Sequence, residues 1–295
     1  MRSVGLDIGG TNIKGVVIDN DGNILSSYER KSNYHEKDYM KNIEGIIQEL
    51  LDYCGNEIEG IGIGVPGIVD NEEGKVIVCP ALSWKDVYLK KHIENKFKIK
   101  TIIENDVNSW TIAEKYFGCT KNFKDFVMIT IGTGIGCGIY INNSIYRGNT
   151  FESGEVGYLP LGLDAYNRQY STEDFGYFES NASASSVGIK YKLKTGRTLG
   201  CKEIFERARK GEKVALEVVE EIYNYLGLGI GAISCIINPG KIVIGGGMAN
   251  EGEEFIYQVS KNVNKLIPFS TSIELSKTGQ YGGAMGSAQL VFLQS

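Results

Sequence analysis

Two segments far apart in the chain share one hairpin pattern. Residues 6–19 read LDIGGTNIKGVVID and residues 129–142 read ITIGTGIGCGIYIN, and their apolar and glycine positions coincide at a constant offset. In each copy a run rich in β-branched residues enters a glycine turn and leaves as an alternating strand. This pattern is typical of a β-hairpin and not of a strand followed by a helix. The repeat therefore predicts two half-molecules, each opening with a hairpin.

The rest of the chain alternates strand and helix patterns. Strands are expected at 24–29, 61–65, 101–103, 241–244 and 272–275, and helices at 37–54, 106–117, 213–237 and 282–292. We expect the stretch from 66 to 98 to be irregular and the stretch 148–178 to be rich in turns. Such alternation implies α/β layers, and 295 residues suffice for one large domain or two of ordinary size.

Composition and charge exclude several classes of protein. The 31 Lys+Arg and 36 Asp+Glu residues give a net charge of −5, so there is no basic excess to hold nucleic acid or an anionic membrane. The first residues lack the apolar core of a secretory signal, and the longest apolar stretch, 226–237, is too short to span a bilayer. We therefore expect a cytoplasmic protein. The 6 cysteines are scattered without a C-x-x-C pair, which indicates reduced thiols and not metal ligands.

The glycine-rich segment 7–14, DIGGTNIK, is the first chemical signal. Gly9 and Gly10 let backbone N–H groups approach a ligand, and Thr11 adds a hydroxyl, a combination that suits phosphate oxygens. Asp7 ends an apolar strand, where a carboxylate is costly unless it meets a cation, water or a donor. A role linked to Mg²⁺ follows from this placement. The alternative is a tight hairpin in which Asp7 is only a cap.

Three further glycine loops follow predicted strands. The loop at 132–136 leads into a strand, whereas a dinucleotide fingerprint needs a helix there, so a Rossmann site is excluded. The loops at 64–67 and 245–247 come directly after buried strands, the usual place for ligand loops in α/β sheets.

Asp106 belongs to the segment END, 104–106, where a strand meets a helix. Its carboxylate could cap that helix. It could also act as a base at the rim of a cleft between the halves, orienting and deprotonating a hydroxyl group. The two roles are compatible.

Together these residues resemble the ROK group of bacterial sugar kinases and sugar-responsive repressors, within the actin/hexokinase/Hsp70-type ATPase fold. The resemblance covers nearly the whole chain and rests on ordered motifs: DIGGTNIK (7–14), GVPG (64–67), ENDVN (104–108), the glycines of 132–138, GEVG (154–157), NP (238–239) and GGG (245–247). It implies two RNase H-like lobes that close over ATP and a sugar. The smaller lobe would comprise 1–117 and a C-terminal helix at about 281–295 that crosses back onto it, and the larger lobe 118–280.

The resemblance also implies roles for individual residues and a homodimeric assembly. Asp106 would be the base for the 6-hydroxyl of the sugar. The sugar contacts would come from Gly67, Asn105, Asp106, Glu155, Tyr158 and Glu179. ATP would be held by Asp7, Gly9, Gly10, Thr11, Asn12, Lys14, Gly132, Thr133, Gly134, Gly245, Gly246 and Gly247, with Asp7 as a ligand of Mg²⁺.

One departure from the group concerns a structural zinc site. Members usually carry one His and three Cys ligands there, but the matching positions of this chain hold Tyr158, Tyr170, Thr172 and Tyr177, while Gly176 and Glu179 keep the register. None of these four side chains offers a thiolate or an imidazole, so no structural zinc is expected and aromatic packing should order the loop instead. Because the His also helps to recognise the sugar in zinc-bearing relatives, Tyr158 leaves the identity of the substrate open.

The resemblance favours an ATP- and Mg²⁺-dependent kinase that phosphorylates the 6-hydroxyl of a hexose-type sugar: N-acetylmannosamine, a β-glucoside or glucose. A non-catalytic sugar-sensing regulator is the first alternative. Such repressors carry an N-terminal helix-turn-helix, whereas the phosphate loop here begins at Asp7, and the charge of −5 offers no DNA footprint. An ATPase or carboxylate kinase on the same fold is the second. Glu155 and Glu179 favour a neutral polyol over an anionic acceptor, which they would repel.

Overall fold

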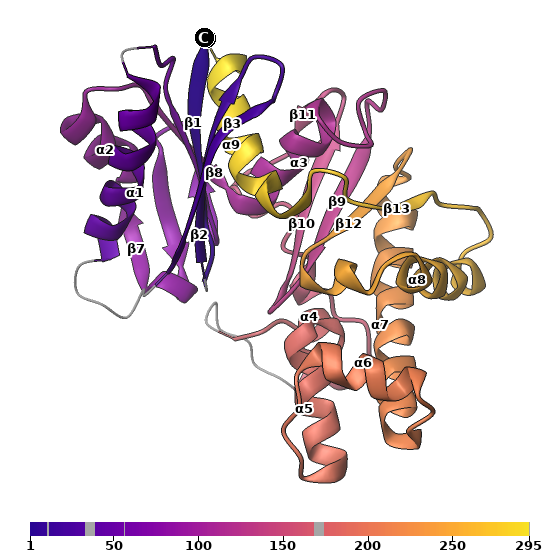
Figure 1. Ribbon diagram of the computed structural model, residues 1–295. Coiled ribbons are helices and arrows are strands. Elements are labelled where there is room, and N and C mark those ends of the chain that lie inside the picture. Colours follow the sequence, from indigo (N-terminus) through magenta and orange to yellow (C-terminus); the bar gives the residue numbers. More distant parts are fainter. Residues whose placement is uncertain (11, 33–38, 56, 168–173, 295) are drawn as a thin grey trace.

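The computed structural model describes residues 1–10, 12–32, 39–55, 57–167 and 174–294 (Figure 1). In these residues the strands form two five-stranded sheets and a three-stranded one. The first large sheet has the order β3-β2-β1-β4-β8 and the second has the order β11-β10-β9-β12-β13. Both orders place the opening hairpin beside a parallel strand from later in the chain, so the sheets are topologically equivalent.

The strands of the first sheet are β1 (Arg2–Ile8), β2 (Asn12–Asp19), β3 (Ile24–Lys31), β4 (Ile61–Val65) and β8 (Thr101–Asn105). Those of the second are β9 (Phe126–Ile131), β10 (Ile135–Ile141), β11 (Ser144–Ile145), β12 (Ile242–Gly245) and β13 (Ile273–Leu275). The antiparallel pairs β1/β2 and β9/β10 are the two hairpins predicted from the repeat. The predicted α/β class and the two hairpins are thus confirmed.

Helices connect and cover these sheets. Those of the described residues are α1 (Tyr39–Cys54), α2 (Leu89–Phe97), α3 (Asp106–Tyr116), α4 (Tyr177–Ala182), α5 (Ala184–Thr195), α6 (Cys201–Arg209), α7 (Lys213–Ile237), α8 (Glu253–Leu266) and α9 (Gly282–Leu293). On α1 the spacing of Ile43, Ile46, Ile47 and Leu50 turns one apolar face to the first sheet, and each is at most 2% exposed. Burying one such side chain stabilises the fold by about 1.5–3 kcal/mol.

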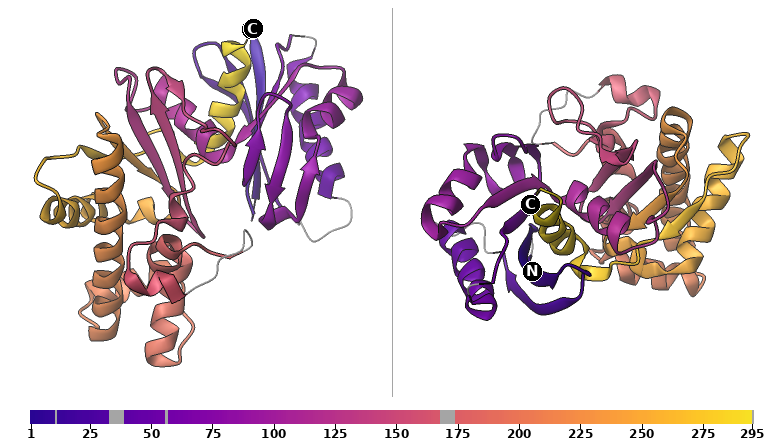
Figure 2. Two further views of the ribbon diagram at one scale, coloured as in Figure 1. Left: turned by 180° about the vertical axis from the view of Figure 1, so that it is seen from behind. Right: turned by 90° about the horizontal axis from the view of Figure 1, so that it is seen from above.

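Helices α3 and α9 pack against each other between the two sheets (Figures 1 and 2). The close approach depends on residues without a side chain. A Cβ atom on Gly5 would lie 2.0 Å from the carbonyl oxygen of Ala284, and one on Gly286 would lie 1.6 Å from that of Ser109. These glycines therefore let α9 lie directly on β1 and on α3, as expected for a C-terminal helix that returns to the first sheet.

The expectation of an irregular stretch between 66 and 98 is wrong. It contains β5 (Ile68–Asp70), β6 (Lys75–Cys79) and β7 (Trp84–Val87), which form the three-stranded sheet, and then α2. These strands span only 3 to 5 residues, too few for an alternating pattern to stand out from the turns around them. Within the described residues, no helix has the length and apolarity needed to cross a membrane.

Candidate active site

The carboxyl ends of three parallel strands meet at one edge of the first sheet. In register, Asp7 of β1 pairs with Gly64 of β4, and Gly64 pairs with Glu104 of β8. Residues just beyond these positions therefore gather at this edge, where open α/β sheets bind their ligands. The edge carries Asp7, the loop after β4 with Gly67, and the pair Asn105 and Asp106.

Asp106 is the first residue of α3, and the cap of that helix is Asn105. The Asn105 side-chain oxygen accepts the N–H groups of Val107 at 2.9 Å and Asn108 at 3.0 Å. Capping as the role of Asp106 is thus wrong, because the strand extends two residues further than 101–103 and moves the cap to Asn105. Asp106 still accepts the N–H of Val107 at 2.9 Å. Burial raises its pKa to about 6, against the lowering effect of that hydrogen bond.

Asn105 also fixes the neighbouring loop. Its side-chain NH₂ donates to the carbonyl oxygen of Gly67 at 3.0 Å. Gly67 has a φ of +90°, and a Cβ atom there would lie 2.3 Å from the carbonyl oxygen of Val78. A glycine is therefore required at this turn, both for its dihedral angle and for space.

Two more carboxylates lie near Asp106, one from each half of the chain. Burial and the Asp106 charge raise the pKa of Asp7 to about 7, while Lys14 opposes the shift. Glu155 precedes the short 3₁₀ turn Val156–Tyr158, and burial, Asp106 and Glu179 raise its pKa to about 7. The structure thus brings the predicted base and two other predicted site residues into one acidic cluster.

Glu179 lies at the turn of the second hairpin. Its two oxygens accept the N–H groups of Ile135 at 2.8 Å and Gly176 at 3.2 Å. A Cβ atom on Gly134 would lie 2.4 Å from the Glu179 carboxylate. Burial raises the pKa of Glu179, and the two N–H groups oppose the shift. Glu179 therefore joins the 132–135 turn to the start of α4. Its carboxylate accepts these two backbone hydrogen bonds whether or not a ligand is bound.

The residues at the zinc-ligand positions are held by hydrogen bonds where the structure describes them. The hydroxyl of Tyr158 donates to the carbonyl oxygen of Asp174 at 3.1 Å. Tyr177 is buried, its hydroxyl donates to Asp164, and its ring packs edge-on against the ring of Tyr225. Tyr170 and Thr172 lie outside the described residues. Within the described part of the chain, no three His, Cys, Asp or Glu side chains group as a metal site would require.

The predicted nucleotide loops occupy corresponding edges of the two sheets. In Figure 1 the C-terminal ends of β1 and β9, where the two hairpins turn, point to the same end of the molecule. A Cβ atom on Gly10, Gly132 or Gly247 would meet no atom within 4 Å, so these backbones border open space. Gly245 pairs with Thr130, which places the turns at 132–134 and 245–247 side by side.

The polar side chains of the first hairpin have partners within the protein. Asn12 donates to Glu29 at 2.8 Å, and the Lys14 ammonium donates to the carbonyl oxygen of Gln280 at 3.1 Å. Lys14 also lies near enough to Asp7 to oppose its pKa shift. Of the predicted nucleotide contacts, Thr11 lies outside the described residues.

Sequence reasoning missed two charged side chains, Arg147 and Glu114, that join distant segments. Arg147 forms an ion pair with the buried Glu104, at 2.6 Å. Glu114, fully buried on α3, accepts hydrogen bonds from Ser276, Lys277, Thr278 and Cys119. Neither group carries a motif of its own, because each finds its partners only when distant segments fold together.

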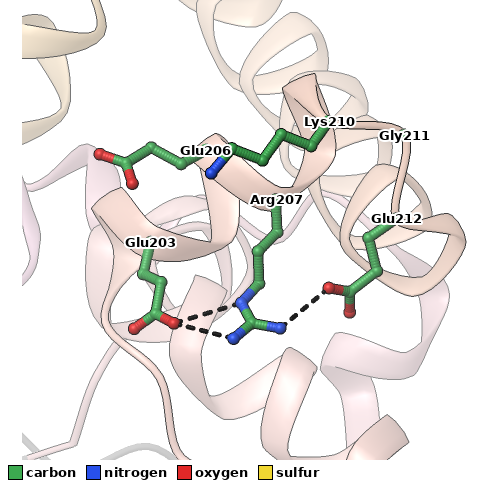
Figure 3. Close-up of a pocket in the computed structure, with 6 residues that line it drawn as sticks. All are labelled: Glu203, Glu206, Arg207, Lys210, Gly211 and Glu212. Atoms are coloured by element: carbon green, nitrogen blue, oxygen red, sulfur yellow. Dashed lines mark hydrogen bonds and ion pairs between the residues drawn. The ribbon is translucent and has the colours of Figure 1, made fainter.

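A separate depression of 570 Å³ lies between the end of α6 and the start of α7 (Figure 3). It is lined by Glu203, Glu206, Arg207, Lys210, Gly211 and Glu212. Arg207 bridges Glu203 at 3.0 Å and Glu212 at 3.1 Å across it. No predicted site residue belongs to it, so it is a charged surface hollow apart from the acidic cluster.

Comparison with known proteins places this geometry in a family. The crystal structure of a ROK family glucokinase from Streptomyces griseus, in complex with glucose and AMPPNP, is 26% identical with a TM-score of 0.84, covering 98% of this chain and 99% of that one. Lmo2764 of Listeria monocytogenes, for which N-acetylmannosamine kinase activity is suggested, is 26% identical with a TM-score of 0.88, covering 100% and 99%. These neighbours have the actin-like ATPase fold, as predicted.

A regulator is also among the relatives. The xylose repressor of Bacillus subtilis is 28% identical over 98% of this chain and 76% of the repressor. The sequence model of the ROK family matches residues 3–293, and the chain therefore belongs to the ROK family.

Proposed function

We propose that the chain is an ATP-dependent sugar kinase that transfers the γ-phosphoryl group to the 6-hydroxyl of a hexose-type sugar. The observation that carries the proposal is the position of Asp106, whose charge acts both on Asp7 of β1 and on Glu155 from the second half of the chain. The glucokinase neighbour with bound glucose and AMPPNP supports the same choice of donor and acceptor.

Asp106 is the proposed general base. A base works best when its pKa lies near the working pH, and burial raises the pKa of Asp106 to about 6. At pH 7 it is mostly ionised and accepts the proton of the 6-hydroxyl as the phosphoryl group arrives. Positioned proton transfer of this kind contributes a factor of about 10²–10⁴ to the rate.

The acceptor sugar would be oriented by groups from both sheets. Asn105 and Gly67 hold the loop beside the base. Glu155, with a pKa of about 7, can accept a hydrogen bond from a sugar hydroxyl when ionised and donate one when protonated. Glu179 keeps lone pairs for a hydroxyl beyond the two N–H groups it accepts. Together these groups favour a neutral polyol.

The nucleotide would lie on the glycine turns of both hairpins and on 245–247, where open backbone can approach phosphates. The donor set fits Mg²⁺, which takes one or two carboxylates plus substrate phosphates: Asp7 is a carboxylate whose pKa is raised by burial and by the charge of Asp106, and a cation would offset both effects. Asp7 would hold the ion, which would offset phosphate charge during transfer. We also propose that 1–117 with α9 and 118–280 act as two lobes that close to exclude water.

A coupled ATP assay tests the proposal. The purified chain would be offered Mg-ATP with glucose, mannose, fructose, N-acetylglucosamine, N-acetylmannosamine or cellobiose, and phosphorus NMR would locate the phosphate on the product. ATP turnover should depend on at least one of these sugars and yield a 6-phosphate. Asp106→Asn should bind sugar and ATP but turn over at least about a hundredfold more slowly.

Other outcomes distinguish the alternatives. ATP hydrolysis that no sugar stimulates would indicate an ATPase. Sugar binding without turnover, together with retardation of DNA in a gel, would indicate a regulator like the xylose repressor. Full turnover by Asp106→Asn would remove Asp106 from its role as base.

A further inference from the structure

An ion pair with two hydrogen bonds joins the two sheets beside the proposed base. Arg147 follows β11 of the second sheet, and Glu104 lies in β8 of the first. The Nε and Nη2 atoms of Arg147 donate to one oxygen of Glu104 at 3.0 and 2.6 Å. The Glu104 side chain is 2% exposed and that of Arg147 is 26% exposed. We call this pair the 104–147 bridge.

On the first sheet, the 104–147 bridge acts directly on the residues around Asp106. The second oxygen of Glu104 accepts the backbone N–H of Asn105 at 3.0 Å and the side-chain NH₂ of Asn108 at 3.1 Å. Asn105 in turn caps α3 and holds Gly67. Glu104 therefore fixes the residue immediately before the base and the first turn of its helix.

On the side of the second sheet, Arg147 is the first residue of the segment 147–155, which ends at Glu155. The N–H of Ser153 donates to the carbonyl oxygen of Arg147 at 3.2 Å, which closes the segment on itself. Gly154 then turns with a φ of +95°, and a Cβ atom there would lie 2.1 Å from the carbonyl oxygen of Cys137. Moving Arg147 would therefore move the start of a tightly constrained loop that carries Glu155.

The chemistry of the pair makes its geometry specific. A buried carboxylate that loses its cation is left with an uncompensated charge, so Glu104 depends on Arg147. The planar guanidinium directs two N–H groups at one oxygen of Glu104, which fixes direction as well as distance, whereas a lysine ammonium supplies only a point charge. A lysine at position 147 would keep the charge and lose the alignment.

We propose that the 104–147 bridge is a positioning device for the acceptor half of the site: it sets the separation of Asp106 from Glu155, and with it sugar affinity and turnover, while the nucleotide side is unaffected. This inference rests on the proposed kinase function. The predicted nucleotide turns at 132–134 and 245–247 lie on other segments, and among the described residues neither turn forms a hydrogen bond or ion pair with Glu104 or Arg147.

The test uses Arg147→Lys and Arg147→Ala, with the Arg209–Glu251 pair as a matched control. That pair is also 2.6 Å long, involves a carboxylate that is 9% exposed, and lies on α6 and the 247–251 turn. Arg147→Lys should raise the sugar KM and lower kcat by about tenfold or more, as a misplacement of about 1 Å can do, while the ATP KM stays within about twofold. Arg209→Lys and Arg209→Ala should leave the sugar KM and kcat unchanged, because that pair contacts neither the acceptor residues nor Glu104.

Several results would overturn the proposal. Unchanged sugar KM and kcat in Arg147→Lys and Arg147→Ala would show that the bridge is only structural, and so would equal rises in the sugar and ATP KM. Circular dichroism checks folding, and if Arg147→Ala does not fold, the milder Arg147→Lys decides. If the wild-type chain phosphorylates no sugar, the proposed function fails separately, and calorimetric sugar binding then decides: unchanged affinity in Arg147→Lys overturns the bridge proposal.

Discussion

Asp106→Asn should make the protein more stable while it removes activity. In the folded chain, burial raises the pKa of Asp106 from 3.8 to about 6, so the ionised carboxylate is less favourable there than in the unfolded chain. Asparagine has nearly the same shape and carries no charge. It therefore removes the unfavourable charge and keeps the volume.

The size and pH range of the effect follow from linkage. The shift from 3.8 to about 6 is about two pKa units, and each unit corresponds to about 1.4 kcal/mol, which gives about 3 kcal/mol. A raised folded-state pKa adds stability that is fully present below the unfolded pKa and is lost as the pH rises through the folded pKa. The wild type should therefore lose this contribution between about pH 4 and pH 6, and Asp106→Asn should not.

Urea unfolding of the wild type and Asp106→Asn between pH 4 and pH 8 measures this difference, alongside sugar kinase activity. The two proteins should be about equally stable near pH 4, and the variant should be more stable by about 1–3 kcal/mol above pH 7. Asp19→Asn is the control. Hydrogen bonds from Asn23 and Asp21 hold the pKa of Asp19 below its usual value, so its loss should weaken the fold at neutral pH and leave turnover unchanged. A destabilised Asp106→Asn at pH 8 would refute the reasoning.

Three further substitutions test the supporting structure. Burial alone would raise the pKa of Glu114, but hydrogen bonds from Ser276, Cys119 and Thr278 hold it below its usual value. Glu114→Gln should therefore lower the free energy of unfolding in urea by about 2 kcal/mol or more. The loss should be smaller in acid, where Glu114 is protonated. Gly67→Ala should strain the turn by about 1–3 kcal/mol and raise the sugar KM, whereas Gly211→Ala, with a φ of +86° but open space, should leave the KM unchanged. Tyr177→Phe removes the hydroxyl that donates to Asp164 and should lower the thermal midpoint of unfolding by a few degrees in scanning calorimetry. An unchanged midpoint would show that this hydrogen bond is not needed and that aromatic packing alone orders the segment around Tyr177.

Local sequence patterns predicted the parts of the fold that local physics controls. The two hairpins were predicted because alternating residues around a glycine turn determine the strand pairing by themselves, and α7 was predicted with the bounds Lys213–Ile237 because its apolar face repeats over many turns. The strands β5, β6 and β7 were not predicted. Each is short, and their sheet forms only because they pair with one another.

The candidate site divides in the same way. The place of Asp106 at the junction of a strand and a helix followed from the local pattern. The sequence could not distinguish Asp106 from Asn105 as the helix cap, because Asn and Asp are nearly equal caps and only the extension of β8 separates them. Glu114 and the 104–147 bridge depend on contacts between segments far apart in the chain, which no local pattern encodes.

The acidic cluster explains why these long-range contacts matter. Asp7, Asp106 and Glu155 come from different elements, and each element alone tolerates its carboxylate. The unfavourable free energy appears when folding buries all three, which raises each pKa, and the Asp106 charge adds to it at Asp7 and Glu155. Lys14 opposes the shift at Asp7 but not at Asp106 or Glu155, so the apolar cores and well-paired groups such as Glu104 and Glu114 must offset the cost. Weakening those supports should therefore separate the carboxylates before it unfolds the chain, and activity should be lost before stability.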